Sequence, residues 1–336
     1  MKKIIITSLE KGAGKTTVAL ALALKANKKF GYFKPIGDNP LYKEKKIIDY
    51  DAFLFREVFG MDTLPEEMCL GLHHSKILHF YPDVKKEFMK RMEKISQGKE
   101  LFIIEGGEYP WSGASLGLDV FSISKEIGGK IIFVVSGDYH NILDEITYIS
   151  KMNVENLKGV ILNMIDEFNE KIIEEIESKG VKFLGYLPEI KKLKAVKVSY
   201  IAEKLFAKVV AGENGLDNYV ENVFIAALSA PEIKRHPDFK KKNKLIITGG
   251  DRADVIMACV ENGTSGIILT NNIVPSANIL ARANEKGIPL LSVRPDTYTV
   301  AKLVENIQPV ILPEEKDKLD EIEKEAENIK IEEILG

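Results

Sequence analysis

A short segment near the start of the chain combines glycines, a lysine and threonines in an order that can hold a phosphate group. Gly12 and Gly14 are followed by Lys15, Thr16 and Thr17. The glycines let successive backbone N–H groups point at one spot, and a helix starting there adds the positive end of its dipole. Lys15 would then reach the β- and γ-phosphates, and Thr16 would bind Mg²⁺. The segment therefore predicts a nucleotide-binding loop.

The sequence on both sides of this loop supports the interpretation. The apolar residues 4–7 before it fit a buried strand, and the apolar residues 18–24 after it fit a helix. The usual motif has a glycine five positions before its second glycine, where this chain has Leu9. An ordinary strand-to-helix turn is the alternative, and the flanking pattern favours the phosphate loop. The residues expected to contact the nucleotide are Gly12, Ala13, Gly14, Lys15, Thr16 and Thr17.

Two acidic residues are candidates for completing a metal site. Glu105 ends an apolar strand pattern and precedes two glycines, which allow close approach of the backbone to another group. Asp51 is either a Mg²⁺ ligand acting through water or the N-cap of a helix, and the residues leave both open.

Two further polar residues end predicted strands. Lys34 stands where an ammonium group would face the γ-phosphate or an acidic substrate, with an ordinary surface lysine as the alternative. Asn163 stands where such folds place residues that read the base. Its amide would pair with adenine, whereas Asp166 three residues later would accept from guanine. The residues themselves therefore leave ATP and GTP both open.

Alternating apolar runs and helical patterns in the first half of the chain would position these side chains. Continuously apolar strands predict an α/β fold of the P-loop NTPase type, in which helices cover both faces of a mainly parallel sheet. Ligands bind at the carboxyl ends of the strands in such a sheet. The predicted strands are residues 4–7, 31–35, 101–105, 130–136, 159–163 and 182–188.

The pattern changes after Pro188, and a smaller α/β unit follows with predicted strands at 244–248, 266–270 and 289–293. Beyond Pro313 the apolar residues recur at spacings of three and four, which predicts an amphipathic helix that docks on its own protein or on a dimer mate. The expected organisation is a nucleotide-binding domain, a second α/β domain and a charged C-terminal helix, at residues 1–195, 196–312 and 313–336 respectively.

Composition limits the classes of function. The 336 residues include 47 Lys and Arg and 50 Asp and Glu, a formal net charge of −3, so nothing favours nucleic acid or an anionic membrane as partner. No apolar run approaches the ~20 residues that span a bilayer, and the start does not resemble a signal peptide. The two cysteines lack metal-ligand spacing. A cytoplasmic location is therefore expected.

These motifs together resemble the dethiobiotin synthetase and cobyrinic acid diamide synthase group of P-loop proteins over residues 1–190. Members of that group bind ATP and Mg²⁺, and the enzymes among them activate a carboxylate or carbamate by phosphorylation. The resemblance also implies a homodimer. It rests on the phosphate loop, Gly31–Pro35, Asp51-Ala52, Glu105-Gly106-Gly107, Asn163 and Leu184–Pro188.

The resemblance assigns roles to individual residues of this chain. Lys15 and Lys34 would be catalytic, because they would stabilise the charge of the transferring phosphoryl group. Asn163 would contact the base. The metal-binding residues it implies are Thr16, Asp51 and Glu105.

The second unit resembles a DRTGG domain, although only Asp251 and Arg252 of the naming motif are kept. The pairing of the two modules is similar to the N-terminal, regulatory half of long phosphate acetyltransferases. No room remains for the acetyltransferase domain, so that activity is expected to be absent. Gly249 and Gly250 with Asp251 and Arg252 are expected to form a small anion or nucleotide site, or else an internal Asp–Arg ion pair at a turn.

Two classes of function follow. In one, the first domain is an ATPase or phosphorylates a carboxylate substrate at the expense of ATP, and the second domain regulates it. In the other, the bound nucleotide is a signal that changes dimer or partner packing, and hydrolysis is slow or absent.

Overall fold

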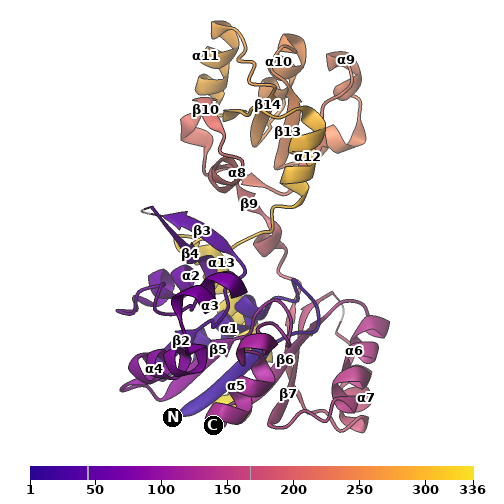
Figure 1. Cartoon of the computed structure of the whole chain (residues 1–336). Helices are drawn as coiled ribbons and strands as arrows, with labels where there is room; N and C mark the ends of the chain where they lie inside the picture. The colour runs from indigo at the N-terminus through magenta and orange to yellow at the C-terminus, as the bar shows by residue number, and fades with distance from the viewer. Residues whose placement is uncertain (44, 167) are drawn as a thin grey trace. The chain divides into compact units, whose positions relative to one another are not determined.

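The structure is a computed structural model that describes residues 1–43, 45–166 and 168–336. These residues divide into two units (Figure 1). Unit 1 consists of Met1–Ile190 and Ile311–Gly336, and unit 2 consists of Lys191–Val310. Unit 2 is therefore an insertion between two segments of unit 1. The tail, which the sequence predicts as a separate C-terminal helix, is part of unit 1.

In the described part of unit 1 a six-stranded sheet has the order β2-β5-β1-β6-β7-β8, with every neighbouring pair parallel. All five residues of β5 are buried, as are the last six of β6, which agrees with burial of both sheet faces. The predicted parallel sheet is confirmed. Its strands are β1 (Lys2–Thr7), β2 (Phe30–Phe33), β5 (Leu101–Glu105), β6 (Lys130–Ser136), β7 (Leu157–Ile165) and β8 (Phe183–Pro188).

Helices cover both faces of this sheet, as expected for the P-loop class. Apolar side chains of α4, α5, α6 and α7 pack on one face, in a core that includes Phe102 and Phe133. On the other face α1 lies against β1 and β5, and α2 lies against β2. A hairpin of β3 (Pro40–Lys43) and β4 (Lys46–Asp49) leads into α2. The helices are α1 (Lys15–Lys25), α2 (Tyr50–Phe59), α3 (His74–Phe80), α4 (Val84–Ser96), α5 (Val120–Ile127), α6 (Tyr139–Lys151) and α7 (Lys171–Ser178), with the short turn η1 (Ala114–Leu116).

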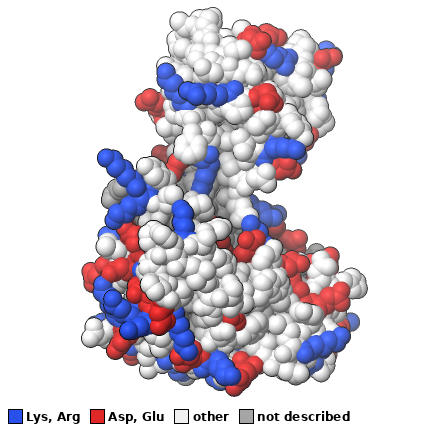
Figure 2. Space-filling model, viewed as in Figure 1, with Lys and Arg blue, Asp and Glu red and all other residues white. Residues whose placement is uncertain are grey.

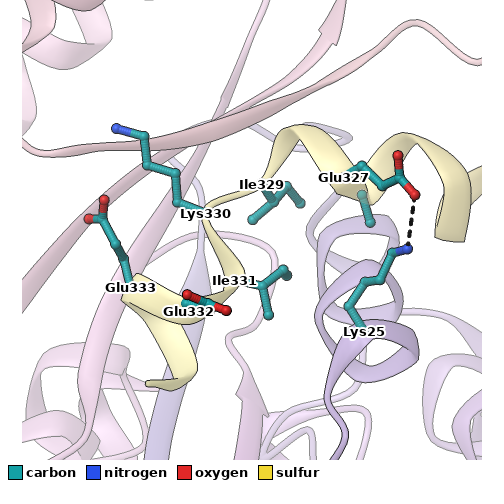
Figure 3. Close-up of a pocket in the computed structure, with 8 residues that line it drawn as sticks. Lys25, Glu327, Ile329, Lys330, Ile331, Glu332 and Glu333 are labelled. Carbon is teal, nitrogen blue, oxygen red and sulfur yellow. Dashed lines mark ion pairs between the residues drawn. The ribbon is translucent and has the colours of Figure 1, made fainter.

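The tail packs on unit 1 as α13 (Lys316–Glu325), η5 (Ala326–Asn328) and α14 (Ile331–Leu335). The sequence predicts one helix here. The structure has two, because Ile329 is extended and bridges Gly185 of β8. Helix α13 lies against α1, and Lys25 Nζ lies 3.6 Å from Glu327 Oε1 beside a shallow surface hollow (Figure 3). This hollow is at the carboxyl end of α1, about 15 Å along the helix from the phosphate loop.

Unit 2 contains a five-stranded sheet of order β10-β15-β14-β13-β12 in its described residues. Strands β12 to β15 are parallel neighbours, and β10 is antiparallel to β15. The predicted smaller α/β unit is confirmed. Its elements are η2 (Lys191–Lys194), β9 (Val196–Lys197), α8 (Val198–Lys204), β10 (Lys208–Ala211), η3 (Glu213–Gly215), β11 (Tyr219–Val220), β12 (Asn222–Ile225), α9 (Ala230–Ile233), η4 (Pro237–Lys240), β13 (Lys244–Gly249), α10 (Ala253–Glu261), β14 (Gly266–Thr270), α11 (Ala277–Lys286), β15 (Leu290–Ser292) and α12 (Thr297–Glu305).

The surface carries charges of both signs. On the face in Figure 2, Lys and Arg side chains are interspersed with Asp and Glu, in line with the small formal net charge of −3. Among the described residues, no helix has the length and apolar character needed to cross a membrane.

Candidate nucleotide and metal site

The phosphate loop joins β1 to α1 at the carboxyl edge of the sheet. Gly12 and Gly14 have φ angles of +78° and +86°, a region that favours glycine. A Cβ atom on Gly14 would lie 2.0 Å from Asn163 Nδ2. Among the described residues no side chain caps α1, so the first N–H groups of the helix point at the loop without a protein side-chain acceptor. This geometry suits an anion.

Asn163 braces the loop. Its Nδ2 donates a hydrogen bond to the Ala13 carbonyl, 2.8 Å away, and the side chain is 3% exposed. The structure thus gives Asn163 a role that the sequence did not suggest, and contact with a base stays a prediction.

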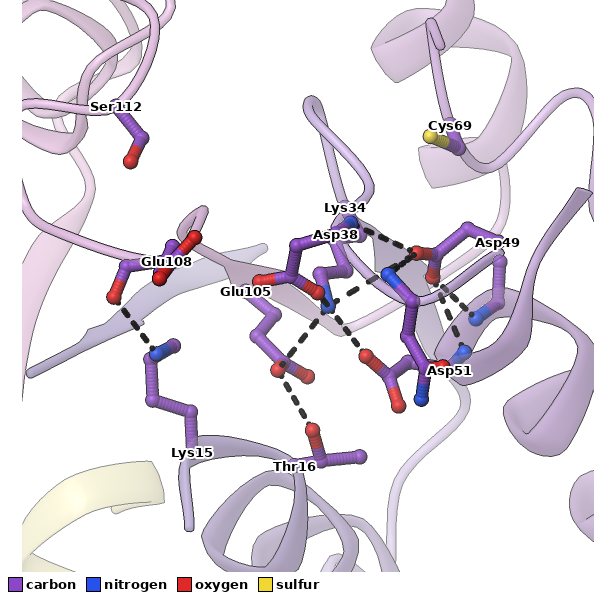
Figure 4. Close-up of polar contacts among 12 residues, drawn as sticks. Lys15, Thr16, Lys34, Asp38, Asp49, Asp51, Cys69, Glu105, Glu108 and Ser112 are labelled. Carbon is purple, nitrogen blue, oxygen red and sulfur yellow. Dashed lines mark hydrogen bonds and ion pairs between the residues drawn. The ribbon is translucent and has the colours of Figure 1, made fainter. Parts of the chain in front are cut away.

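Lys15 lies inside the site, 7% exposed. Its Nζ donates to Ser8 Oγ at 3.1 Å. It also donates to the Glu108 carbonyl at 3.3 Å (Figure 4). Burial lowers the pKa of Lys15, and the Glu105 carboxylate acts against that shift. The two oxygen acceptors hold the ammonium group beside the phosphate loop.

Glu105 is the centre of the acidic side of the site. Its Oε1 accepts from Thr16 Oγ1 and its Oε2 accepts from the Tyr32 hydroxyl, both at 2.8 Å. The side chain is 1% exposed, and burial raises its pKa to about 7, with Lys34 opposing the shift. The structure therefore brings together Thr16 and Glu105, two of the three expected metal ligands.

Lys34 is buried among carboxylates and is not a surface lysine. It forms ion pairs with Asp51 and, at 2.6 Å, with Asp38 Oδ1. Glu105 Oε1 and Asp49 Oδ2 lie 3.8 and 3.9 Å from its Nζ. Burial alone would lower the pKa of Lys34, but these carboxylates outweigh it and hold that pKa well above its usual value.

The N-cap of α2 is Asp49. Its Oδ1 accepts from the N–H groups of Asp51 and Ala52, each at 3.1 Å. The N-cap alternative for Asp51 is therefore wrong, and the Asp51 carboxylate faces Lys34 instead. Burial raises the pKa of Asp49 to about 6.

Sequence reasoning missed three residues of the site. Asp38 and Asp49 each place a carboxylate oxygen within 4.8 Å of one from Asp51. Tyr32 stacks on Phe55 and bonds Glu105. Two sequence signals could have found Tyr32 and Asp49. Tyr32 lies within the Gly31–Pro35 motif, and Asp49 is a second acid two positions before Asp51.

The donor set fits a hard divalent cation. Two ammonium groups, of Lys15 and Lys34, face four carboxylates, which leaves a formal excess of two negative charges when all are ionised. The Thr16 hydroxyl with carboxylate oxygens is the ligand chemistry that Mg²⁺ prefers. These ligand types, next to the N-terminus of α1, therefore fit a magnesium ion.

The residues singled out in unit 2 have structural contacts. Arg252 donates to the carbonyls of Ala226 and Leu228, which ties β13 to the segment after β12. A Cβ on Gly250 would lie 1.8 Å from the Ile273 carbonyl oxygen, so the close approach of that chain requires glycine. No Asp251–Arg252 ion pair occurs within the described ranges. The small anion or nucleotide site expected at residues 249–252 stays a prediction.

Comparisons with known proteins cover both modules. The AAA domain family matches residues 2–197 and the DRTGG domain family matches residues 200–307. The chain is 24% identical over 349 residues to the phosphate acetyltransferase of Nitratidesulfovibrio vulgaris, covering 94% of this chain and 49% of that protein. For the Synechocystis enzyme the identity is 24% over 344 residues, with coverage of 94% and 48%. The chain spans about half the length of the curated relatives it matches.

Similar solved structures include the cell division protein MinD of Aquifex aeolicus, at 18% identity and a TM-score of 0.35, covering 57% of this chain and 84% of that one. The CBS and DRTGG regulatory region of Clostridium perfringens pyrophosphatase, complexed with diadenosine tetraphosphate, has 24% identity and a TM-score of 0.31, covering 36% and 50%. Scores this low bear on neither site nor function.

The family matches agree with the two modules that the motifs resemble and with the two sheets of the structure. The chain therefore belongs to the AAA domain family through residues 2–197, carries a DRTGG domain at residues 200–307, and is homologous to the N-terminal half of long phosphate acetyltransferases.

Proposed function

We propose that this protein binds ATP in a Mg²⁺-dependent manner at the carboxyl edge of the unit 1 sheet. The observation that carries the proposal is the Thr16–Glu105 hydrogen bond of 2.8 Å at the start of α1. It joins a hydroxyl and a carboxylate, the ligand types of a nucleotide-bound magnesium ion, directly beside the free N–H groups of the phosphate loop.

Each residue of the site has a role in this proposal. The backbone N–H groups of residues 12–17 bind the phosphates, and Lys15 exchanges its contact with the Glu108 carbonyl for a phosphate oxygen. Thr16, Glu105 and Asp51 hold Mg²⁺. The ion supplies positive charge that offsets the phosphates and the acidic cluster. Lys34 holds Asp51 and Glu105 in place, through the ion pair with Asp51 and the 3.8 Å approach of its Nζ to Glu105 Oε1.

The finer part of the proposal is phosphoryl transfer, either to water or to a carboxylate substrate. Lys15 and Lys34 would stabilise the charge on the transferring group. Lys34 is only 1% exposed, and its Asp38 partner is the most exposed of its four carboxylates, with 31% of that side chain accessible. Movement of Asp38 would open Lys34 to an acidic substrate. Single-turnover phosphate release above a Lys15→Ala control is the test, and release equal to that control would contradict phosphoryl transfer.

A specific contact favours the sensor as the second candidate. Glu108 lies just after β5. Its backbone carbonyl accepts a hydrogen bond from Lys15, and its carboxylate forms an ion pair with Lys11 Nζ, 3.1 Å away. Nucleotide phosphates would compete for both lysines, so binding alone would change the segment after β5. The sensor requires that nucleotide alters proteolysis or oligomeric state without turnover, and no alteration of either would contradict it.

Four finer statements belong to the proposal. ATP rather than GTP, a homodimer and a cytoplasmic location rest on the resemblance and on composition. The absence of acetyltransferase activity rests on the resemblance of residues 1–336 to the N-terminal, regulatory half of long phosphate acetyltransferases. Competition between the two nucleotides, light scattering in solution and an acetyl transfer assay test the first, second and last of these.

A further inference from the structure

Tyr32 connects the acidic side of the site to its apolar surroundings. The side chain is 0% exposed, and its ring stacks on Phe55 with centroids 3.7 Å apart and an interplanar angle of 9°. Its hydroxyl donates to Glu105 Oε2 at 2.8 Å, while Thr16 donates to Oε1. The two oxygens of Glu105 thus have different, fixed donors.

Strand register explains why a tyrosine can do this. Tyr32 of β2 is paired with Ile103 of β5, and Glu105 lies two residues further along on the same face. Two residues of strand span about 7 Å, a gap that a side chain with a terminal hydroxyl can bridge. A phenylalanine at this position would pack equally well on Phe55 but would have no hydroxyl to donate to Glu105.

The ring also touches the helix that carries another expected ligand. Asp51 and Phe55 are four residues apart in α2, so they share one face of that helix. The Tyr32 ring stacks on Phe55, and its hydroxyl forms a hydrogen bond with Glu105. Tyr32 therefore lies between this face of α2 and the end of β5. Asp51 and Glu105 are thereby held on either side of Lys34.

We propose that Tyr32 is a positioning residue for the metal site, whose hydroxyl fixes the Glu105 carboxylate with Oε1 directed at Thr16. This inference rests on the proposed Mg²⁺-dependent nucleotide binding. Residues that orient a metal ligand without touching the ion commonly contribute tenfold to a hundredfold to metal affinity. The Tyr32 hydroxyl acts only through Glu105, so the effect of removing that hydroxyl must disappear when Glu105 is changed.

The first experiment measures binding of a non-hydrolysable ATP analogue by calorimetry, with and without Mg²⁺. Tyr32→Phe lowers the gain in affinity from Mg²⁺ about tenfold or more, while the affinity measured without Mg²⁺ stays at the wild-type value. Tyr50→Phe is the matched control. It removes the hydroxyl of another buried tyrosine, which donates to the Ile311 carbonyl at 3.0 Å and not to Glu105, and it keeps the wild-type response.

The second experiment is a double-mutant cycle with Glu105→Gln. The cycle isolates the pair, because a purely structural effect of Tyr32→Phe would persist in either background. In the Glu105→Gln background Tyr32→Phe changes Mg²⁺-dependent affinity by less than about twofold. A wild-type response in Tyr32→Phe, or an equal loss in both backgrounds, overturns the positioning role and leaves the proposed function intact. A wild-type protein without any Mg²⁺ response overturns the proposed function, and this inference with it.

Discussion

Buried charges near the candidate site differ in whether they have partners. Lys34 has carboxylates on several sides, whereas both carboxylate oxygens of Glu145 are buried without a hydrogen-bond partner among the described residues. Burial raises the pKa of Glu145 from its usual 4.5 to about 7, and Glu10 adds to the shift. An ionised Glu145 is therefore unfavourable in the folded chain.

A pH dependence follows for stability. The folded-state pKa of Glu145 is raised, so the folded chain holds a proton that the unfolded chain has lost, and the free energy of unfolding falls as pH rises from 4.5 to about 7. Glu145→Gln removes this term. The variant should be more stable than wild type by about 1 kcal/mol at pH 8, a value reduced for the solvent exposure of the side chain, and equal to it near pH 4. Urea unfolding at both pH values measures this, and a difference that does not change with pH would contradict it.

The two glycines of the phosphate loop give a matched pair of substitutions. Both have positive φ, but a Cβ on Gly12 meets nothing within 4 Å, whereas one on Gly14 would lie 2.0 Å from Asn163 Nδ2. Gly12→Ala should cost about 1 kcal/mol of backbone strain. Gly14→Ala should cost more and break the Asn163–Ala13 bond. Denaturant unfolding and nucleotide binding compare the two, and equal losses would show that Asn163 does not brace the loop.

At the scale of elements, the segment after β5 is tied to the phosphate loop through Glu108. Trp111, the single tryptophan of the chain, stacks on Tyr109 with centroids 5.0 Å apart, and it is 56% exposed. Ser112 Oγ accepts from the Tyr109 N–H at 2.9 Å, a hydrogen bond that links Tyr109 to the residue after Trp111. Loss of the Lys15–Glu108 hydrogen bond should therefore change the surroundings of the Trp111 ring.

Tryptophan fluorescence should report nucleotide binding. Addition of a Mg²⁺–ATP analogue should change the intensity or wavelength of Trp111 emission, because phosphates draw Lys15 away from the Glu108 carbonyl. Lys15→Ala provides the control and should show no change. Saturated binding in the wild type with unaltered emission would mean that the segment does not respond.

The sequence predicted the features that depend on neighbouring residues, and it missed contacts between distant parts of the chain. The apolar strands, the glycine turn, Thr16 at a helix start and Glu105 at a strand end each follow from residues close together in the sequence. The structure brings Thr16 and Glu105, which are 89 positions apart, to one sheet edge. Asp49 precedes α2 and Asp51 lies in its first turn. Only the hydrogen bonds from the N–H groups of Asp51 and Ala52 to Asp49 Oδ1 show that Asp49 is the N-cap. Tyr32 and Asn163 make their bonds to residues 73 and 150 positions away. Such contacts depend on strand order, which the sequence pattern left open.

At the scale of the whole molecule, unit 2 interrupts unit 1, and the chain returns to complete the first core. The spacing of apolar residues predicted an amphipathic tail, but not the surface that it covers. In the structure Ile322 and Ala326 are fully buried, Ile329 bridges β8, and Lys28 Nζ donates to the Leu335 carbonyl at 2.6 Å. The tail thus packs against α1, the helix that follows the glycine loop.

Truncation after Val310 should selectively destabilise unit 1. It removes several buried Ile and Leu side chains, each worth about 1.5–3 kcal/mol, which is a large share of a typical domain's stability. Differential scanning calorimetry should show the transition of unit 1 at lower temperature and that of unit 2 unchanged. An unchanged unit 1 transition would contradict the role of the tail.

The most direct test of the account is calorimetric titration of the purified protein with ATP and GTP analogues, with and without Mg²⁺, beside Lys15→Ala. We expect the wild type to bind the ATP analogue in a Mg²⁺-dependent manner and the GTP analogue more weakly, and we expect Lys15→Ala to lose binding. Absence of binding by the wild type, or equal binding by Lys15→Ala, would contradict the central claim that residues 12–17 form a working nucleotide site.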